Sequence, residues 1–395
     1  MGKNILEGIV VLDISSLIAG PYCGSLLGDM GAEVIKIESP WAGDEIRHVG
    51  LQVDGEGALF LALNRNKRSV SLNLKCAEGR EILDRLFERA DVVIENVRPG
   101  VRGKYGLHYE RVREIKSDII QLSITSFGEE GPYKDKPGAD HVFQGLSGIM
   151  SISGGPGQGP LRIGVPVADM TTAMFGVYGV LGALFHREKT GEGQLVAVNL
   201  LDAAMCLQTT LMTTYLFDGK EPEQLGNDNP FAYPVGCYET IDGYINISVF
   251  SDKFWNKLCI ALEIEDLAND KRFSTGDKRL ANKEDLRPIL KERFVTKSTD
   301  EWLMLLEQAD VPCGRVHSYG TVFSDPQVVQ NNLVKTLFHP KLNKFKTLGN
   351  PVRFHNTAVR ESQAASPLGS DTVSILRSIG YSKLQIEELR ERKAI

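Results

Sequence analysis

The stretch SVSLNLKCAEGREILDRLFERADVVIENVRPG, residues 69–100, decides the fold. Its β-branched runs Ser69–Leu74 and Val92–Glu95 predict two strands, and Cys76–Ala90 between them has the apolar spacing of a helix. Strand, helix and strand in this order form a βαβ unit, whose two strands are parallel. We therefore predict a parallel sheet with helices on its faces.

The same alternation continues on both sides of this stretch. Further strands are predicted at Ile9–Ile14, Val34–Ile37, Ile119–Ile124 and Leu195–Leu200, and helices at Thr171–His186 and Asp202–Leu216. The fold class is therefore α/β. In such sheets, ligands gather at the carboxyl ends of the strands.

A second, smaller domain follows a change in composition. Residues Phe217–Gly236 are rich in Gly, Pro, Asn and Asp, which indicates a linker or a long loop. Asp242-Gly243 then separates two alternating strands, which is the pattern of a hairpin. Helices are predicted at the end of this region, over Lys253–Leu262, Lys283–Phe294 and Thr299–Gln308. We predict a large domain over residues 1–219, a small α+β domain over 220–324, and two more helices within 370–395.

Composition excludes several classes of protein. The 395 residues are 42% hydrophobic and 24% charged, which is enough apolar material for a sizeable core. The net charge of −6 argues against a nucleic-acid-binding protein. The N-terminus lacks the pattern of a secretory signal, and the best membrane-span candidate, Met170–Phe185, is too short and contains Thr and Gly. We expect no nucleic-acid partner and no membrane.

Six scattered cysteines without a CxxC pair fit a reducing cytoplasm rather than a disulfide framework. The seven histidines lack the spacing of metal ligands, so we also expect no metal.

Positive charge is concentrated in one segment. Residues 65–116, called the basic island below, contain 13 Lys or Arg and 8 Asp or Glu, whereas the rest of the chain carries a net −11. Polar and basic residues follow two successive predicted strands, at 72–75 and at 96–104. An anionic cofactor would bind at such strand ends. Solvated helix faces are the alternative for each single residue.

Asp169 is the first candidate for chemistry. It stands directly before the apolar helix predicted at Thr171–His186, where an Asp is a favoured N-cap. The same helix terminus stabilises an ionised carboxylate, which is the form that a carboxylate nucleophile needs. Both interpretations remain open from the residues alone. The Gly-rich segment Gly154–Pro160 lacks the Lys-Ser/Thr of a phosphate-binding loop, and we interpret it as a flexible loop that could cover a site.

Several motifs, in their order and spacing, resemble family III CoA-transferases of the CaiB/BaiF type over nearly the whole chain. They are Leu12-Asp13 with Ala19-Gly20-Pro21, Gly31–Glu38, Asn66–Ser69, Asp91–Asn96 with Pro99-Gly100, the Asp169 segment, Lys189–Gln194 and Ile379–Ser382.

The resemblance implies transfer of CoA from an acyl-CoA thioester to a free carboxylic acid, with Asp169 as the nucleophile. The implied intermediates are an aspartyl mixed anhydride and an aspartyl-CoA thioester. CoA thioester is then a substrate, and no cofactor is bound permanently. An α-methylacyl-CoA racemase and a non-catalytic acyl-CoA-binding protein are the alternatives. The racemase needs a His in a Gly-His-Asp triplet, and this sequence has Gly138-Ala139-Asp140 there, with His141 out of register.

The family's CoA-contacting positions map onto a set of residues that partly falls within the basic island: Ile18, Ala19, Ser39, Leu72, Asn73, Leu74, Lys75, Asn96, Val97, Arg98, Lys104, Pro137, Gly138, Ala139 and Asp140. Ser39 and Lys104 stand where some relatives carry Arg. Ala139 stands where formyl-CoA:oxalate transferases have Tyr, which argues against oxalate as the acid.

The resemblance also implies an architecture. The large domain would be Rossmann-like and would be completed by residues 325–395. Two chains would interlock as rings in a homodimer.

Overall fold

The computed structural model describes residues 4–357 and 360–395, and within them the chain forms two compact units. Unit 1 contains the described residues of 1–149, 162–219 and 331–395. Unit 2 contains residues 150–161 and 220–330.

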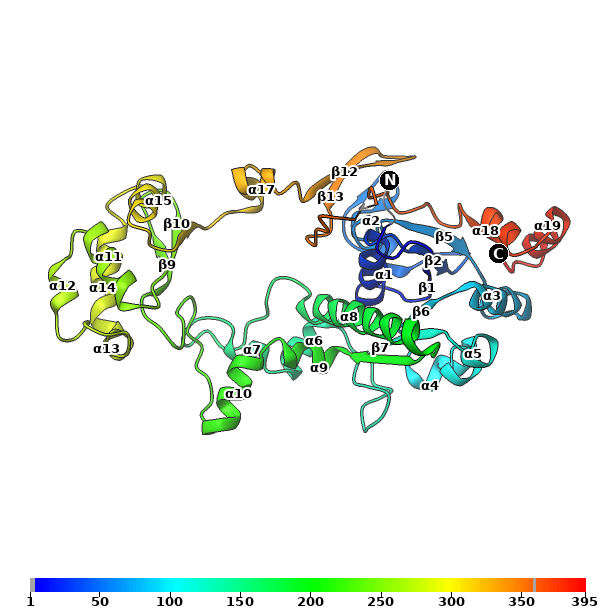
Figure 1. The fold of residues 1–395 in the computed structure, drawn as a ribbon, viewed down its shortest axis with the longest axis horizontal. Helices are drawn as coiled ribbons and strands as arrows, with labels where there is room; N and C mark the ends of the chain where they lie inside the picture. Colours follow the sequence, from blue (N-terminus) through cyan, green and yellow to red (C-terminus); the bar gives the residue numbers. More distant parts are fainter. Residues whose placement is uncertain (1–3, 358–359) are drawn as a thin grey trace. The chain divides into compact units, whose positions relative to one another are not determined.

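Unit 1 is built on a six-stranded sheet in which all neighbouring strands are parallel. In spatial order the strands are β5 (Lys67–Ser71), β2 (Glu33–Glu38), β1 (Val10–Asp13), β6 (Val92–Glu95), β7 (Ile120–Thr125) and β8 (Leu195–Asn199) (Figure 1). The predicted α/β class is confirmed. The chain runs outward from β1 in both directions, which creates a switch point between β1 and β6 where ligands of such sheets bind.

Both faces of this sheet are buried, because alternate residues of each strand enter opposite cores. Val10 and Leu12 of β1 share one core with α3 (Ala77–Arg89), α5 (Tyr109–Ile115), α18 (Thr372–Ser378) and α19 (Lys383–Glu391). Val11 enters the other core, with α1 (Ala19–Asp29) and α8 (Val167–Thr190). Burial on both faces explains the uninterrupted apolar residues at the start of β1 and β6.

Helix α8 is longer than the sequence pattern predicts. Its 24 residues begin four positions before the predicted helix and end at Gly191, which has the left-handed φ of 76° that favours glycine. By length and by a mean hydropathy of 1.4 it could cross a membrane, so the expectation that this segment is too short is wrong. The helix packs on α1, α9, β7 and β8, and a helix that covers a sheet is apolar for the same reason.

Smaller elements complete unit 1. The predicted helix at 202–216 is two helices, α9 (Leu200–Cys206) and α10 (Thr209–Asp218), and the chain turns where Gln208 Nε2 donates to Ser147 O at 2.9 Å. A hairpin that the sequence pattern does not predict is formed by β12 (Val334–His339) and β13 (Asn343–Leu348). The remaining elements are η1 (Glu45–His48), β3 (Gln52–Val53), β4 (Glu56–Gly57), α2 (Ala58–Leu63), α4 (Pro99–Arg102), η2 (Gly103–Tyr105), α6 (Asp140–Leu146) and, across the boundary of the units, α7 (Ile149–Ile152).

Unit 2 has a three-stranded antiparallel sheet in the order β11 (Cys313–Arg315), β10 (Tyr244–Ser248), β9 (Val235–Glu239). The predicted hairpin at Asp242-Gly243 is confirmed. The main helices are α11 (Asp252–Ala261), α14 (Lys283–Phe294) and α15 (Thr299–Gln308), as the sequence predicts within one residue. Shorter helices are α12 (Asp266–Asn269), α13 (Gly276–Ala281), α16 (Tyr319–Val322) and α17 (Pro326–Gln330).

The Gly-rich segment Gly154–Pro160 belongs to unit 2. Gln224 Nε2 donates to Ser153 O at 2.7 Å and to Gly159 O at 2.8 Å, which fixes both ends of the segment. The division into domains at residues 220 and 324 stays a prediction.

Candidate active site

A cavity of about 550 Å³ opens at the carboxyl edge of the parallel sheet. We call it the Asp169 cavity. Its walls come from the loops after β1, β6 and β7 and from the starts of α6 and α8: Ser16–Ala19, Ile46, Val49, Asn96, Arg98, Pro99, Ile124–Ser126, Lys134, Pro137–His141, Arg162, Gly164, Pro166, Asp169 and Leu200. All of these residues belong to unit 1.

Asp169 is the third residue of α8, so it lies in the first turn and is not the N-cap, which is Pro166. Asp140 serves the helix terminus instead, because its Oδ1 accepts hydrogen bonds from Ala168 N at 2.8 Å and from Asp169 N at 3.3 Å. The Asp169 carboxylate has no hydrogen-bond or ion-pair partner in the described part of the chain. The N-cap interpretation of Asp169 is therefore wrong, and its side chain is left available to a ligand.

Burial, and to a smaller extent the neighbouring Asp140 carboxylate, together raise the pKa of Asp169 from 3.8 to about 7. Position in the first helical turn acts in the opposite direction, since a helix N-terminus favours the ionised form. The group is therefore ionised at mildly alkaline pH and poorly solvated there, which is the state of a reactive carboxylate nucleophile.

The loop after β1 separates the Asp169 cavity from a second one, and polar side chains hold its backbone. Asn96 Oδ1 accepts from Ser16 N at 3.0 Å, and Asn96 Nδ2 donates to Ser16 O at 2.8 Å. Leu17 N donates to Asp44 Oδ1 at 3.1 Å, with Leu17 at a φ of 68°. A non-glycine residue in this left-handed region is held there by its surroundings, here by the Asp44 carboxylate.

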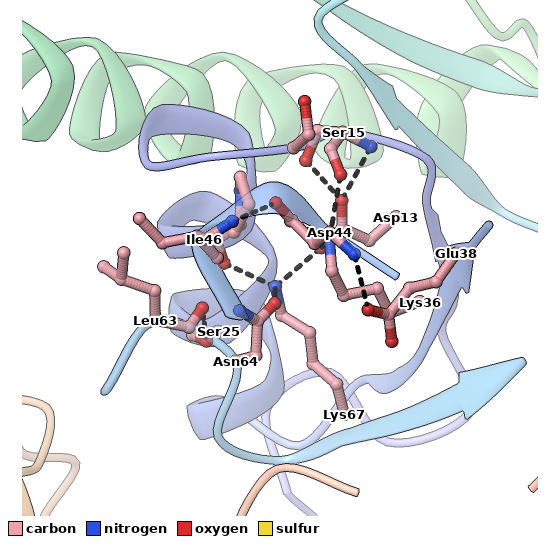
Figure 2. Close-up of polar contacts among 12 residues, drawn as sticks. Asp13, Ser15, Ser25, Lys36, Glu38, Asp44, Ile46, Leu63, Asn64 and Lys67 are labelled. Carbon is pink, nitrogen blue, oxygen red and sulfur yellow. Dashed lines mark hydrogen bonds and ion pairs between the residues drawn. The ribbon is translucent and has the colours of Figure 1, made fainter. Parts of the chain in front are cut away.

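Asp44 belongs to a buried ionic cluster beneath the loop, made of Asp13, Lys36, Asp44 and Lys67 (Figure 2). Lys67 Nζ donates to Asp13 Oδ2 at 2.6 Å, and Lys36 Nζ lies 3.0 Å from Asp44 Oδ2. Burial would raise the pKa of Asp13, but the two ammonium groups outweigh it and lower the pKa to about 2. All four charges are thus compensated within the protein, and they fix the loop at the end of β1.

The packing of α1 on this cluster requires glycine. A Cβ at Gly24 would lie 3.1 Å from both Asp13 Oδ2 and Lys67 Nζ, and one at Gly20 would lie within 2.3 Å of Ser15 Cβ. The small residues of the segment Ala19–Gly24 therefore allow the helix to approach the ionic cluster closely.

The second cavity, of about 370 Å³, lies on the other side of the loop. We call it the Lys75 cavity. Ser16 lines both cavities, whereas Asn96 lines the Asp169 cavity and its neighbour Val97 lines the Lys75 cavity. The two cavities therefore adjoin at the ends of β1 and β6.

The structure brings most of the sequence-predicted site residues into these two cavities. Those in the Asp169 cavity are Ile18, Ala19, Asn96, Arg98, Pro137, Gly138, Ala139, Asp140 and Asp169. Those in the Lys75 cavity are Ser39, Leu72, Asn73, Leu74, Lys75 and Val97. Lys104 lines neither and is exposed in η2, one residue before Tyr105, which lines the Lys75 cavity.

The sheet order shows how the predicted CoA contacts lie along the carboxyl edge of the sheet. The polar segments at 72–75 and 96–98 follow β5 and β6, which β2 and β1 separate. Ser39 after β2 and Ile18 after β1 fill the positions between them. With Pro137–Asp140 after β7, the predicted CoA contacts follow five adjacent strands, β5, β2, β1, β6 and β7.

The basic island is only partly available to an anion. Arg65, Lys67 and Arg102 are buried and paired with Asp29, Asp13 and Glu95 respectively. Among the described residues, the exposed cations Lys75, Arg98 and Lys104 have no ion-pair partner. The sequence alone could not separate these groups, because the carboxylate partners lie up to 54 positions away.

Sequence reasoning missed Asp13, Lys36 and Lys67 as parts of the site's support, and it missed Arg162 in the cavity wall. A charged residue at the end of an otherwise apolar strand, as Asp13 is, was the one available signal. Within residues 4–357 and 360–395, no group of three or more His, Cys, Asp or Glu side chains could hold a metal ion.

Comparison with known proteins gives the chain a family context. Residues 6–372 match the sequence profile of CoA-transferase family III. The chain is 35% identical over 386 residues to human succinyl-CoA:glutarate CoA-transferase, covering 97% of this chain and 88% of that one. It is 36% identical to succinate–glutarate CoA-transferase of Agrobacterium fabrum (95% of this chain, 96% of that one). It is 33% identical to (R)-2-hydroxy-4-methylpentanoate CoA-transferase of Clostridioides difficile (99% of both).

Solved structures agree with the sequence relatives. A CaiB/BaiF family protein from Brucella suis matches with a TM-score of 0.86 at 35% identity, covering 96% of this chain and 100% of that one. A protein from Mycobacterium tuberculosis matches with a TM-score of 0.84 at 29% identity, covering 94% and 99%.

Proposed function

The chain belongs to CoA-transferase family III, and on that premise we propose that Asp169 carries CoA from an acyl-CoA thioester to a free carboxylic acid. The observation that supports this role is the unpaired Asp169 carboxylate in the wall of the cavity at the sheet's carboxyl edge. Asp140 occupies the helix terminus that would otherwise engage it.

The proposed reaction passes through two kinds of covalent intermediate. The Asp169 carboxylate attacks the donor thioester, a mixed anhydride forms and CoA leaves as the thiolate. The thiolate attacks the aspartyl carbonyl, which releases the donor acid and leaves an aspartyl-CoA thioester. The acceptor carboxylate attacks this thioester to form a second anhydride and expel the thiolate. The thiolate then attacks the acceptor's acyl carbon, which gives the new acyl-CoA and restores Asp169.

Each step exchanges an activated acyl group for another, so no metal or redox group enters the balance. The raised pKa of Asp169 suits this chemistry, because burial makes the carboxylate more reactive while the cavity limits its contact with water.

CoA would lie across both cavities. The nucleotide end would lie in the Lys75 cavity, and the pantetheine chain would pass the loop after β1 and present the thioester to Asp169. Lys75, Arg98 and Lys104 are the exposed cations of the basic island near this path, and phosphates bind such groups. CoA thioester is thus a substrate of this enzyme, with no cofactor bound permanently.

We also propose a Rossmann-like unit 1, an interlocked homodimer and a location in the cytoplasm, without a nucleic-acid or membrane partner. The strand order on both sides of β1 supports the first. Exposed apolar side chains on α8 and α10 support an interface between copies, with Tyr178 78%, Leu216 81% and Phe217 88% exposed. Six free cysteines are compatible with a reducing compartment.

The decisive experiment follows acyl-CoA species by chromatography with a panel of donors and acids. Wild-type protein should move CoA between acids, whereas Asp169→Ala should bind CoA and transfer none. Hydroxylamine or borohydride added with acyl-CoA should modify Asp169. Transfer by Asp169→Ala would refute the proposed nucleophile.

One observation keeps the racemase alternative open. His141, which the sequence pattern places out of register, lines the same cavity as Asp169 and could serve as a second acid/base. Deuterium exchange at the acyl α-carbon, without movement of CoA between acids, would favour that alternative.

A further inference from the structure

The Asp169 cavity contains a cation that the proposed path of CoA does not use. Arg162 lines the cavity together with Asp169, and its guanidinium has no hydrogen-bond or ion-pair partner in the described part of the chain. An exposed arginine in a cavity wall, with its charge unpaired, is a binding group for an anion.

A buried glutamine fixes the segment that carries Arg162. Gln144 of α6 is fully buried, and its Oε1 accepts from Ile163 N at 2.8 Å. Its Nε2 donates to Asp140 Oδ2 at 2.7 Å and lies 3.2 Å from Val165 O. Asp140 in turn holds the backbone of Asp169.

These contacts connect the backbone next to Arg162 with the backbone of Asp169 through only two side chains. The backbone that carries the Arg162 side chain is therefore fixed relative to Asp169. A residue that determines substrate specificity needs such a fixed position.

Arg162 is associated with the thioester end of the proposed CoA site rather than with its phosphate end. Lys75 and Ser39 line the other cavity, where the nucleotide would bind, and Arg98 follows β6 at the junction between the two. The pantetheine chain between the phosphates and the sulfur carries no charge. Because Arg162 lines the cavity of Asp169 and not the Lys75 cavity, we assign it to the acyl group or the free acid rather than to a phosphate.

We propose that Arg162 binds the second carboxylate of a dicarboxylic substrate. The first carboxylate of the acceptor is then positioned to attack the aspartyl-CoA thioester on Asp169. The inference rests on the proposed function and adds a substrate class to it. A planar guanidinium can hold a carboxylate through two parallel hydrogen bonds, which fixes the acid's orientation as well as its position. A monocarboxylic acid of the same length would leave Arg162 without a partner.

The test compares glutarate with pentanoate, which has the same number of carbons and lacks the second carboxylate. The readout is the ratio of kcat/KM for the two acceptors, with saturating succinyl-CoA as donor. We expect the wild type to prefer glutarate. Arg162→Met should lower this ratio by about 10- to 100-fold, as expected for a lost hydrogen-bonded charge pair. The loss should appear mainly in the KM for glutarate, and Arg162→Lys should restore part of it.

Two control variants separate recognition of the acid from other roles. Arg113→Met removes an exposed arginine of α5 that does not line the cavity, and the ratio should not change. Lys134→Met removes another exposed cation of the same cavity, and it should affect both acids alike.

Equal losses for glutarate and pentanoate in Arg162→Met would overturn the inference, as would a wild type that does not discriminate between the two acids. Absence of transfer by the wild type to any acid would instead refute the proposed function, and the inference with it.

Discussion

Replacing Asp169 by Asn should stabilise the protein at pH 8 while it removes the proposed nucleophile. The pKa of Asp169 is raised from 3.8 to about 7 in the folded protein, so the folded protein binds the Asp169 proton more tightly than the unfolded chain does. The free energy of unfolding therefore falls as pH rises from about 4 to 7. The difference between a pKa of 3.8 and one of about 7 corresponds to at most about 4 kcal/mol in the free energy of unfolding.

The net effect is smaller than this limit. The Asp169 side chain keeps some solvent exposure, and the start of α8 stabilises its charge by about 0.3–1 kcal/mol. We expect Asp169→Asn to gain about 2 kcal/mol at pH 8, or about 4–8 °C in the melting temperature at 2–4 °C per kcal/mol. At pH 5 the gain should be less than half as large, because most of the shift lies between pH 5 and 7.

Calorimetry at pH 5 and pH 8 measures this difference. Asp202→Asn is the matched control, because Asp202 lies exposed in the first turn of α9 in the same unit, and its change should stay within about 0.5 kcal/mol. An Asp169→Asn variant that melts below the wild type at pH 8, or gains equally at both pH values, would refute the argument that Asp169 is held ionised at a cost.

Three further predictions concern the rate, the ionic cluster and His141. The kcat/KM of transfer should rise through an acidic limb near pH 7, and Asp140→Asn should move this limb to lower pH because a like charge is removed from Asp169; an unmoved limb would contradict the assignment. Lys67→Met should destabilise the protein by about 3–5 kcal/mol in urea unfolding, since it strips one partner from the buried Asp13 carboxylate; a loss below 1 kcal/mol would show that the cluster rearranges. His141→Ala should keep CoA transfer within about threefold of wild type, whereas a loss of α-proton exchange in the same variant would favour the racemase.

The local sequence pattern predicts a helix or strand well where the residues of that element alone carry the signal. The strand Val92–Glu95 and the helices Lys283–Phe294 and Thr299–Gln308 have the predicted bounds, because the apolar spacing that indicates them lies within the element. Strand β5 begins at Lys67, before its predicted start at Ser69. A lysine indicates an exposed position in sequence, yet Lys67 is 3% exposed because Asp13 pairs with it.

Helix α8 also extends beyond its predicted bounds. The apolar segment predicted only its central part, whereas the helix extends through Asp169 at one end and through Lys189 at the other. Gly191, a residue type that favours the left-handed conformation at a helix end, was the signal in the sequence for the end of α8. At its start, the cap is supplied by Asp140, which lies far away in the sequence. A helix terminus capped from another segment leaves no local trace.

By itself, the sequence determined three properties: the parallel sheet, the binding of ligands at the carboxyl ends of its strands, and the position of Asp169 near the start of a helix. These properties depend on apolar periodicity and on residue types that are neighbours in the chain. Only the tertiary structure decided that Asp140, 29 positions away, takes the helix terminus and leaves Asp169 unpaired with a raised pKa. It also decided which cations of the basic island are neutralised inside and which face a cavity. Solvation and Coulomb energies depend on distance in space, and the groups that set them lie far apart in the chain.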